Sequence, residues 1–215
     1  TKDPEFRFFM SIQILLIVAC TLVMISHQYF DSSWQDFEQV VFQAVSISTT
    51  TGYTTSNFAE WPSFVPMLLI IASFIGGCAG SVGGGLRVAR ILVLYLQGAR
   101  ELKRFVHPNL VYPIKWGQNV LDERVIGSIW AFFSAYLLVF TICLLSVIAC
   151  GVEPFDAFNA VLASINNLGP GLGSVSSNMT AMPDSAKWVL TIAMVCGRLE
   201  IFTLLALFTP AFWKA

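Results

Sequence analysis

Two short segments of the sequence place a glycine among small and polar residues, and the chemistry open to them is cation binding through the backbone. The segment at 49–53 reads Thr-Thr-Thr-Gly-Tyr, and the segment at 166–171 reads Asn-Asn-Leu-Gly-Pro-Gly. Glycine permits backbone angles that turn successive carbonyl groups inward, and carbonyl oxygens can replace the hydration shell of a cation. The two segments therefore predict coordination by peptide oxygens, with Gly52 and Gly169 in matching positions.

A short apolar-rich stretch precedes each segment, at 37–48 and at 155–166. Each stretch is amphipathic, and runs of about 10–14 such residues are too short to cross a bilayer, which is typical of re-entrant helices. Glu153-Pro154 suits the start of the second helix, since proline is favoured in the first helical position. A helix that enters the membrane in this way points its C-terminus at the centre, and that end carries about −0.5 charge, which favours a cation.

The alternative is that both segments are ordinary turns between hydrophobic helices. However, a long span, a short helix, a glycine segment and another span follow one another twice along the chain, and internal duplication is common in membrane transport proteins. Non-helical backbone at membrane depth is tolerated only where it is buried in protein or lines a watery cavity. The repeated pattern therefore favours a pore over two unrelated turns.

The composition is that of a membrane protein. Of the 215 residues, 56% are hydrophobic and only 12% are charged, whereas soluble domains average about 25% charged residues. The net charge of −1 argues against a nucleic-acid binder. The cysteines have no spacing typical of a metal site, and we interpret them as small buried hydrophobes: Cys20, Cys78, Cys143, Cys150 and Cys196.

Four apolar blocks are long enough to cross a bilayer, at about 8–26, 62–103, 125–149 and 185–212. Most basic residues lie between the middle of the second block and the start of the third, which places this side and both termini in the cytoplasm: Arg87, Arg90, Arg100, Lys103, Arg104, Lys115 and Arg124. Acidic residues collect on the opposite side, where as a set they favour cations over anions: Asp31, Asp36, Glu38, Glu60, Glu153, Asp156 and Asp184.

The second block is interrupted at 75–85 by six glycines, each of which costs a helix about 1 kcal/mol relative to alanine: Gly76, Gly77, Gly80, Gly83, Gly84 and Gly85. We expect the span to unwind here and to resume near Leu86, leaving a flexible barrier on the cytoplasmic side of the glycine segments. The alternative is that the glycines only allow helices to pack closely. Neither the lysine of a phosphate-binding loop nor the Gly-x-Ser-x-Gly of a nucleophile elbow is present, so we predict no enzyme.

Arg198 interrupts the last block. An arginine at the bilayer centre costs about 2.5–3.5 kcal/mol on insertion scales and normally faces a bundle interior or water. Counted at 1.5 Å per residue from Ser185, Arg198 lies about 20 Å into the membrane, near the depth of the interrupted span. We expect its charge to raise the barrier to a cation. The alternative is a structural ion pair, with Glu200 or with a distant acid.

With these residues identified, the sequence resembles the Trk/Ktr/HKT superfamily of potassium transporters, and within it the TrkH-type pore subunits. Ser-Ile-Ser-Thr-Thr-Thr-Gly-Tyr and Ile-Asn-Asn-Leu-Gly-Pro-Gly-Leu-Gly are similar to the third and fourth pore-loop signatures, and the resemblance covers about Phe6 to Trp213. It implies that one filter segment each is formed by Thr50, Thr51, Gly52, Tyr53 and by Asn167, Leu168, Gly169, Pro170. It also implies that the glycine-rich stretch is an intramembrane gating loop with Arg198 beside it.

The fold that the resemblance implies is an all-α membrane protein with four span–pore helix–filter–span repeats around one pseudo-fourfold pore. This chain would hold two tandem repeats: the third at 1–105, a cytoplasmic linker at 106–123, and the fourth at 124–215. A carbonyl ring needs contributors on all sides, so the first two repeats must come from elsewhere. The opening Thr-Lys-Asp-Pro-Glu, without an initiator methionine, is consistent with a segment of a longer protein.

The function that the resemblance implies is potassium uptake through the bacterial cytoplasmic (inner) membrane, with K⁺ as the transported ion and no cofactor in this chain. The implied partners are a second pore in a homodimer and a cytosolic TrkA-like nucleotide-binding regulator, which could dock on Arg100, Lys103, Arg104 and Lys115. Two filter segments of four leave K⁺ and Na⁺ both open. The rival hypotheses are a secondary transporter with broken helices and a midplane site, and a membrane scaffold that transports nothing.

Overall fold

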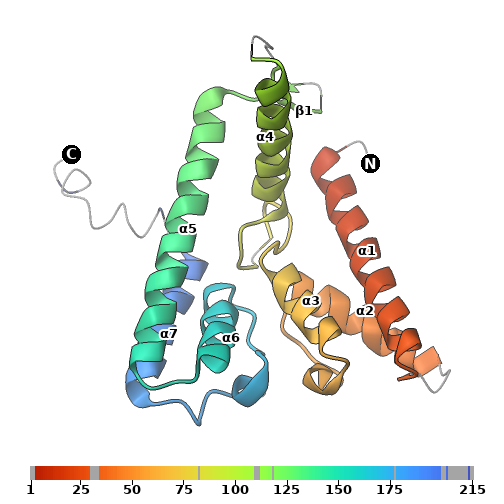
Figure 1. Cartoon of the computed structure of the whole chain (residues 1–215), viewed down its shortest axis with the longest axis vertical. Helices are drawn as coiled ribbons and strands as arrows, with labels where there is room; N and C mark the ends of the chain where they lie inside the picture. Colours follow the sequence, from red (N-terminus) through yellow and green to blue (C-terminus); the bar gives the residue numbers. More distant parts are fainter. Residues whose placement is uncertain are drawn as a thin grey trace.

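The computed structural model of the chain describes residues 3–29, 34–81, 83–108, 112–117, 119–176, 178–199, 202 and 213. Its helices in chain order are α1 Pro4–Ser26, α2 Trp34–Ser48, α3 Phe64–Ser73, α4 Val88–Val106, α5 Glu123–Ala149, α6 Pro154–Ile165 and α7 Asp184–Arg198 (Figure 1). Short 3-10 turns lie at Phe58–Glu60 and Gly173–Val175, and β1 Lys115–Trp116 pairs antiparallel with β2 Asn119–Val120. The predicted all-α fold is confirmed, with a small β-ribbon added.

Two of the described helices, α1 and α5, are long and apolar enough to cross a membrane. Their 23 and 27 residues correspond to about 35 and 40 Å at 1.5 Å per residue. Both begin slightly before the predicted spans, because an aspartate caps each of them. Asp3 accepts a hydrogen bond from the N–H of Glu5 at 3.1 Å, and Asp122 accepts one from the N–H of Arg124 at 3.3 Å. The first and third predicted spans are therefore confirmed as helices.

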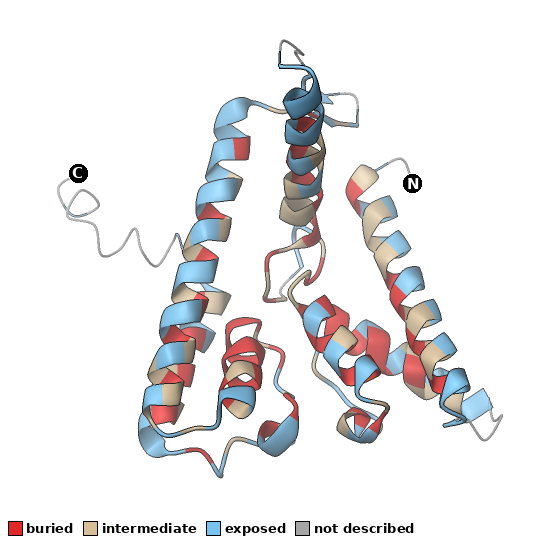
Figure 2. Cartoon of the chain, in the orientation of Figure 1, coloured by how far each residue is buried: buried red, intermediate tan, exposed pale blue. Residues whose placement is uncertain are grey.

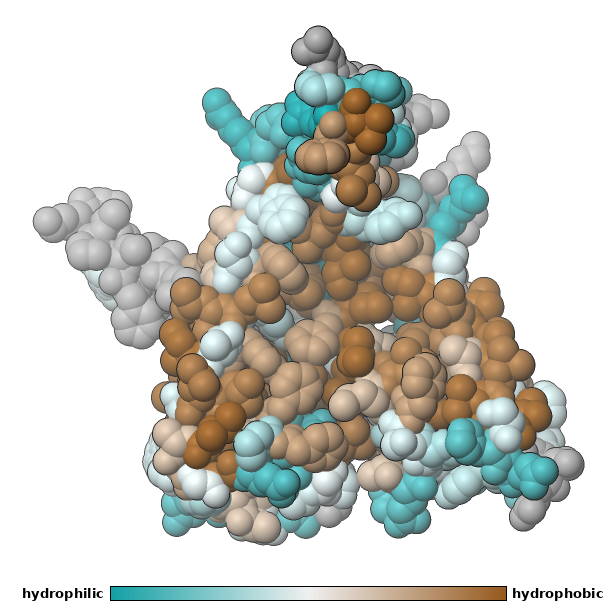
Figure 3. All heavy atoms as spheres, in the orientation of Figure 1, coloured by the Kyte–Doolittle hydropathy of each residue, from teal (hydrophilic) through white to brown (hydrophobic). Residues whose placement is uncertain are grey.

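The outward faces of these two helices are apolar and exposed. Large side chains there are between 57% and 66% exposed: Ile14, Leu15, Leu22, Leu138 and Leu145. Figure 3 shows a hydrophobic belt across the middle of the molecule with hydrophilic atoms at both ends, and Figure 2 shows the buried residues on the faces turned inward. A soluble protein rarely exposes so wide an apolar surface, so the belt suits lipid or further transmembrane helices.

The second predicted span is interrupted as expected. α3 ends at Ser73 and α4 begins at Val88, two residues after the predicted restart. The stretch between them, called the glycine-rich loop from here on, is closed at its base by two hydrogen bonds. The N–H of Leu86 donates to the carbonyl oxygen of Phe74 at 2.9 Å, and the N–H of Val88 donates to that of Gly77 at 3.1 Å. The chain therefore leaves and re-enters helical structure at nearly the same place.

A unit of long helix, short helix and third helix occurs twice, as α1–α2–α3 and as α5–α6–α7. In each unit the short helix packs against both of its neighbours. Figure 1 shows α2 and α6 in the lower half of the molecule between α1 and α5, while the end of α4 and the starts of α1 and α5 lie at the upper end. The basic residues at the end of α4 therefore lie at the end opposite to the short helices.

Arg100 joins α4 to α5 and is not an exposed docking residue. Its side chain is only 3% exposed and forms a bidentate ion pair with the carboxylate of Glu123, at 3.1 Å for the longer contact. The guanidinium of Arg90 lies 4.0 Å from the ring centroid of Phe132, so a second arginine connects the same two helices. Of the basic residues expected to meet a regulator, Arg100 is excluded by burial.

The last predicted span is seen only in its first half. α7 begins at Asp184, close to the expected start, and ends at Arg198. Glu200 and residues 203–212, which belonged to the same prediction, lie outside the described residues.

We predict that Gly197→Ala destabilises the protein. A Cβ at Gly197 would lie 1.9 Å from the carbonyl oxygen of Ile165, so α7 must shift away from α6, and such overpacking costs about 1–3 kcal/mol. The midpoint of thermal unfolding of the complete protein in detergent measures the effect. Gly127→Ala in α5, where nothing lies within 4 Å, is the matched control and should leave the midpoint unchanged or raise it. Equal midpoints for the two variants would contradict the close helix contact.

Candidate functional site

The 50–53 segment leaves α2 through a tight turn, and Ser46 forms hydrogen bonds with the chain through both its carbonyl oxygen and its hydroxyl group. Thr50 has a positive φ of 56°, and the N–H of Thr51 donates to the carbonyl oxygen of Ser46 at 2.8 Å, the main hydrogen bond of a Schellman cap. Gly52 follows with φ 82°. The Ser46 hydroxyl donates to the carbonyl oxygen of Tyr53 at 2.6 Å. The segment therefore turns back along the C-terminal end of the short helix.

The 167–170 segment leaves α6 with the same geometry. Asn167 has φ 52°, and the N–H of Leu168 donates to the carbonyl oxygen of Ala163 at 2.9 Å. Gly169 has φ 100°. Aligning Gly169 with Gly52 therefore aligns both left-handed residues and both capping hydrogen bonds. α6 also starts as expected, with a proline in its first turn.

The two segments lie against each other. A Cβ placed on Gly52 would lie 2.0 Å from the carbonyl oxygen of Leu168 and 3.6 Å from Cδ of Pro170. A real Cβ does not tolerate the first distance, so only glycine permits this approach. Leu168 is buried, whereas Tyr53 is 73% exposed. Residues that are more than one hundred positions apart in the sequence therefore form one continuous backbone surface.

Three helices brace the 167–170 segment. The hydroxyl of Tyr136 in α5 donates to Oδ1 of the fully buried Asn166 at 2.7 Å, and Nδ2 of Asn166 donates to the hydroxyl of Ser73 in α3 at 3.0 Å. Nδ2 of Asn167 donates to the carbonyl oxygen of Met194 in α7 at 3.2 Å. Ser73 belongs to the other repeated unit, so this network joins the two units beneath the segments.

Two buried glutamines, which were not among the predicted site residues, hold the chain on either side of the 50–53 segment. Nε2 of Gln13 in α1 donates to the hydroxyl of Ser48 at 2.8 Å, and both residues are buried. Nε2 of the fully buried Gln43 donates to the carbonyl oxygen of Ser56 at 2.9 Å. A polar side chain inside an apolar span is costly unless it is paired. The isolated glutamine in the first span was therefore a usable signal for Gln13.

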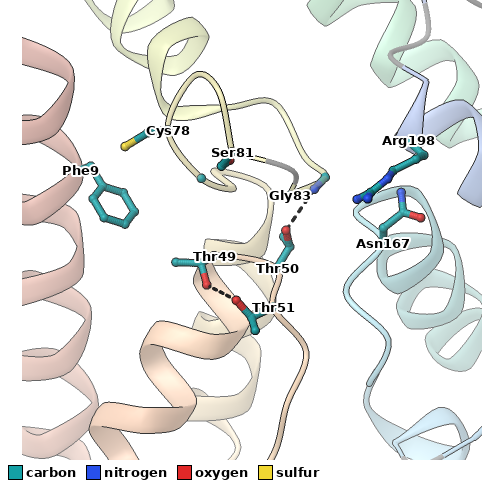
Figure 4. A pocket seen from close by; sticks show the side chains of 11 residues that line it. Phe9, Thr49, Thr50, Thr51, Cys78, Ser81, Gly83, Asn167 and Arg198 are labelled. Carbon is teal, nitrogen blue, oxygen red and sulfur yellow. Dashed lines mark hydrogen bonds between the residues drawn. The ribbon is translucent and has the colours of Figure 1, made fainter.

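The two segments separate two cavities. One, of about 770 Å³, lies at the end of the molecule where the short helices begin and is lined by Gly52, Thr54, Thr55, Ser56, Asn57, Phe58, Gly169, Pro170 and Ser176. The other, of about 530 Å³, is called the inner cavity and is shown in Figure 4; it is lined by Phe9, Thr49, Thr50, Thr51, Gly77, Cys78, Ser81, Gly83, Gly84, Asn167 and Arg198. Residues of both segments line each cavity, so the segments form the partition between them.

The glycine-rich loop lies directly against this partition. The N–H of Gly84 donates to Oγ1 of Thr50 at 3.1 Å, and a Cβ at Gly84 would lie 2.0 Å from the carbonyl oxygen of Asn166. A Cβ at Gly83 would lie 2.7 Å from Oγ1 of Thr50. Two adjacent glycines therefore contact both segments at once, and a side chain at either position would push the loop away.

The other predicted gating glycines surround this contact. Gly76 and Gly77 are buried at the base of the loop, Gly85 is half-buried beside them, and Gly80 is exposed at the tip. The loop thus has a packed base and an exposed tip, and Cys78 and Ser81 beside the tip line the inner cavity.

Arg198, at the end of α7, lines the inner cavity. Figure 4 shows its guanidinium directed toward Asn167 and the glycine-rich loop. The preceding Gly197 makes this placement possible, because its lack of a side chain lets the end of α7 approach the end of α6. Arg198, which was predicted at the depth of the glycine-rich loop, thus lines the same cavity as the loop.

Oxygen atoms of the backbone and of hydroxyl groups are the cation ligands that this site offers. Among the described residues, no group of three or more His, Cys, Asp or Glu could hold a metal ion. Two of the outer acids serve local structure: Glu60 accepts from Nδ2 of Asn57 at 2.7 Å, and Asp156 accepts from the N–H of Ser174 at 3.2 Å. Three of the five cysteines are buried as predicted, and all five are free.

Comparisons with known proteins agree with this architecture. The TrkH family model, described as a cation transport protein, matches residues 1–215. The Trk system potassium uptake protein TrkH of Vibrio parahaemolyticus is 57% identical over 214 residues, which is 100% of this chain and 44% of that protein. The protein of the same name in Escherichia coli K12 is 55% identical over 213 residues, 99% of this chain and 44% of that protein.

A solved structure agrees as well. The crystal structure of the potassium transporter TrkH from Vibrio parahaemolyticus matches with a TM-score of 0.93 at 57% identity, covering 99% of this chain and 45% of that one. The chain spans a little less than half the length of the relatives it matches. Because the family model matches from the first residue to the last, and because the paired short helices, the glycine segments and the interrupted span are all present, this chain belongs to the TrkH family of cation transport proteins.

Proposed function

We propose that this chain supplies two of the four repeats of a potassium-conducting pore. In this proposal the 50–53 and 167–170 segments are two filter segments. K⁺ passes along their peptide oxygens from the cavity lined by Thr54, Thr55 and Ser56, called the outer cavity, to the inner cavity. The observation that carries the proposal is the contact between two identically capped helix ends, with a cavity on each side. The names of the relatives, which are potassium uptake proteins, support it.

The physical basis is the combination of dipoles and unpaired carbonyl groups. The C-terminal ends of α2 and α6 both meet the partition, and each contributes a partial negative charge. Beyond these ends the backbone has no helical hydrogen bonds. Apart from the carbonyl oxygen of Tyr53, which accepts from the Ser46 hydroxyl, the oxygens of the two segments could therefore replace water around an ion. A ring of ligands needs contributors on all sides, and in this proposal the remaining segments come from two further repeats. A secondary transporter with one midplane site would not require two matching helix ends.

The glycine-rich loop and Arg198 form the barrier in this proposal. The loop lies under the partition and contacts Thr50 of one filter segment and Asn166, the residue before the other. Arg198 adds a fixed positive charge to the same cavity, and a cation that enters a low-dielectric cavity is repelled strongly by such a charge. Conduction would then require that the loop leave the partition and that the charge be moved or neutralised.

The surrounding assignments follow from the same proposal. Residues 1–105 would be the third repeat, 106–123 a cytoplasmic linker and 124–215 the fourth repeat, in a bacterial inner membrane with the basic end of α4 inside. The pore would pair with a second copy. A TrkA-like regulator would meet the cytoplasmic end, where Lys103, Arg104 and Lys115 are exposed candidates once Arg100 is excluded. Lys103 already lies 4.3 Å from the ring centroid of Tyr112, which holds it at the surface of this end.

We predict that Gly52→Ala abolishes most potassium uptake by the complete protein. The Cβ would collide with the carbonyl oxygen of Leu168. The two segments must therefore move apart, and their peptide oxygens are no longer positioned to bind the same ion. We expect uptake of K⁺ into potassium-depleted cells to fall by roughly tenfold or more, because a side chain forced into a close-packed contact costs about 1–3 kcal/mol.

The matched control is Gly151→Ala. Gly151 has a similar φ of 88° but nothing within 4 Å of its Cβ position, so it shares the backbone strain without the collision. Its uptake should stay within about twofold of the wild type, because strain in an exposed turn is not transmitted to the partition. Equal losses in both variants would show that backbone strain, and not the segment contact, controls uptake.

We also predict that Arg198→Gln raises the basal potassium flux of the complete protein in proteoliposomes. The substitution removes the fixed charge from the inner cavity while keeping a polar side chain of similar length. Removing a repulsion of ~1.4 kcal/mol corresponds to about a tenfold higher flux. Arg198→Lys, which keeps the charge, is the control and should remain close to the wild type. An unchanged flux in the glutamine variant would remove Arg198 from the barrier.

A further inference from the structure

One face of α1 carries a stripe of residues that all meet parts of the candidate pathway. Glu5, Phe9 and Gln13 follow one another at intervals of four, so they lie one above another on the same face of the helix. Gln13 bonds to Ser48 at the end of α2. Phe9 lines the inner cavity together with Cys78, as Figure 4 shows. Glu5 completes the stripe at the N-terminal end of α1.

Glu5 is bonded to the tip of the glycine-rich loop. The N–H of Ala79 donates to Oε1 of Glu5 across 74 positions of sequence. Glu5 is only 8% exposed, although it is a charged residue in the first turn of a helix. An acid in that turn is favoured by the helix dipole without any tertiary partner, but such a residue ordinarily stays in water. The burial and the long-range hydrogen bond therefore need a further explanation.

The bond to Glu5 is suited to hold a segment that has little packing of its own. Ala79 and Gly80 are exposed, whereas Gly76 and Gly77 at the base are buried. The base is fastened to the partition through the N–H of Gly84 and Oγ1 of Thr50. A hydrogen bond to a carboxylate is about twice as strong as one between neutral groups, so a single acceptor can hold the exposed tip in place.

We propose that Glu5 is a positioning residue that fastens the tip of the glycine-rich loop to α1 and thereby keeps the loop across the inner cavity. The effect of this tether on potassium flux rests on the proposed function, because releasing the loop changes the flux only if the loop blocks conduction. The tether itself is a statement about where the loop tip lies, and it can be tested without measuring transport.

The first test measures how fast a water-soluble maleimide modifies Cys78, which is next to Ala79 and lines the inner cavity. The complete protein is labelled in inside-out membrane vesicles, and the Cys78 peptide is quantified by mass spectrometry. Glu5→Ala removes the acceptor, and Glu5→Gln keeps one acceptor oxygen without the charge. Since both variants are neutral, an electrostatic effect of Glu5 on the thiol is common to them, and their difference reports the hydrogen bond.

We expect Cys78 in Glu5→Ala to react roughly tenfold faster than in Glu5→Gln, as loss of a hydrogen bond of about 1–1.5 kcal/mol implies. The buried Cys20, Cys143 and Cys196 should stay unreactive in every variant, which shows that the fold is intact. Glu101→Ala, which removes an exposed acid of α4 that does not contact the loop, should match the wild type. Equal Cys78 rates in the alanine and glutamine variants would overturn the tether.

The second test measures basal potassium flux of the same variants in proteoliposomes. Glu5→Ala should raise the flux several-fold above Glu5→Gln and Glu101→Ala. Faster Cys78 labelling with unchanged flux would support the tether and contradict the loop as a barrier, which is the failure of the proposed function. Unchanged labelling overturns the role of Glu5 whatever the flux, so the two failures are distinguishable.

Discussion

Every peptide group that leaves a helix within a bilayer needs another partner, and this constraint governs the centre of the molecule. Three stretches of the described chain leave helical structure at that depth: the two segments that follow α2 and α6, and the glycine-rich loop. Each finds local partners first. The two segments use capping hydrogen bonds from the last turn of their helices, and the loop closes its base on the end of α3. Part of the irregular backbone is thus satisfied by hydrogen bonds to neighbouring backbone.

Two further N–H groups of the loop are satisfied by side chains that are distant in the sequence, and a network of side-chain hydrogen bonds joins the other parts of the site. Thr50 accepts from Gly84, Glu5 accepts from Ala79, and Asn166 bridges Tyr136 to Ser73. In an aqueous loop most of these roles would fall to water. In a membrane protein they fall to paired polar residues, which explains why several fully buried polar side chains surround a site made of backbone atoms.

The sequence predicted the elements well because their causes are local. Apolar length fixed the spans, Pro154 marked the start of α6, and clustered glycines marked the break between α3 and α4. The matched geometry around Gly52 and Gly169 also followed from a local repeat. The bracing partners were not predicted, because Gln13, Tyr136 and Glu5 meet residues 30 to 74 positions away, and such pairings have no periodic signal. Arg100 was expected to be exposed. Its burial was not predicted, because it depends on how α4 packs on α5.

The two repeats solve one geometric problem with different side chains, and the difference has a consequence. Both need a left-handed residue after the short helix, and the α5–α6–α7 unit uses Asn167, which tolerates that conformation well. The α1–α2–α3 unit uses Thr50, whose branched side chain is strained at φ 56° by about 1–3 kcal/mol. That strain persists because Oγ1 of Thr50 holds the N–H of Gly84. The loop and the 50–53 segment therefore share one hydrogen bond at a strained residue, so a displacement of the loop must change the energy of the segment as well.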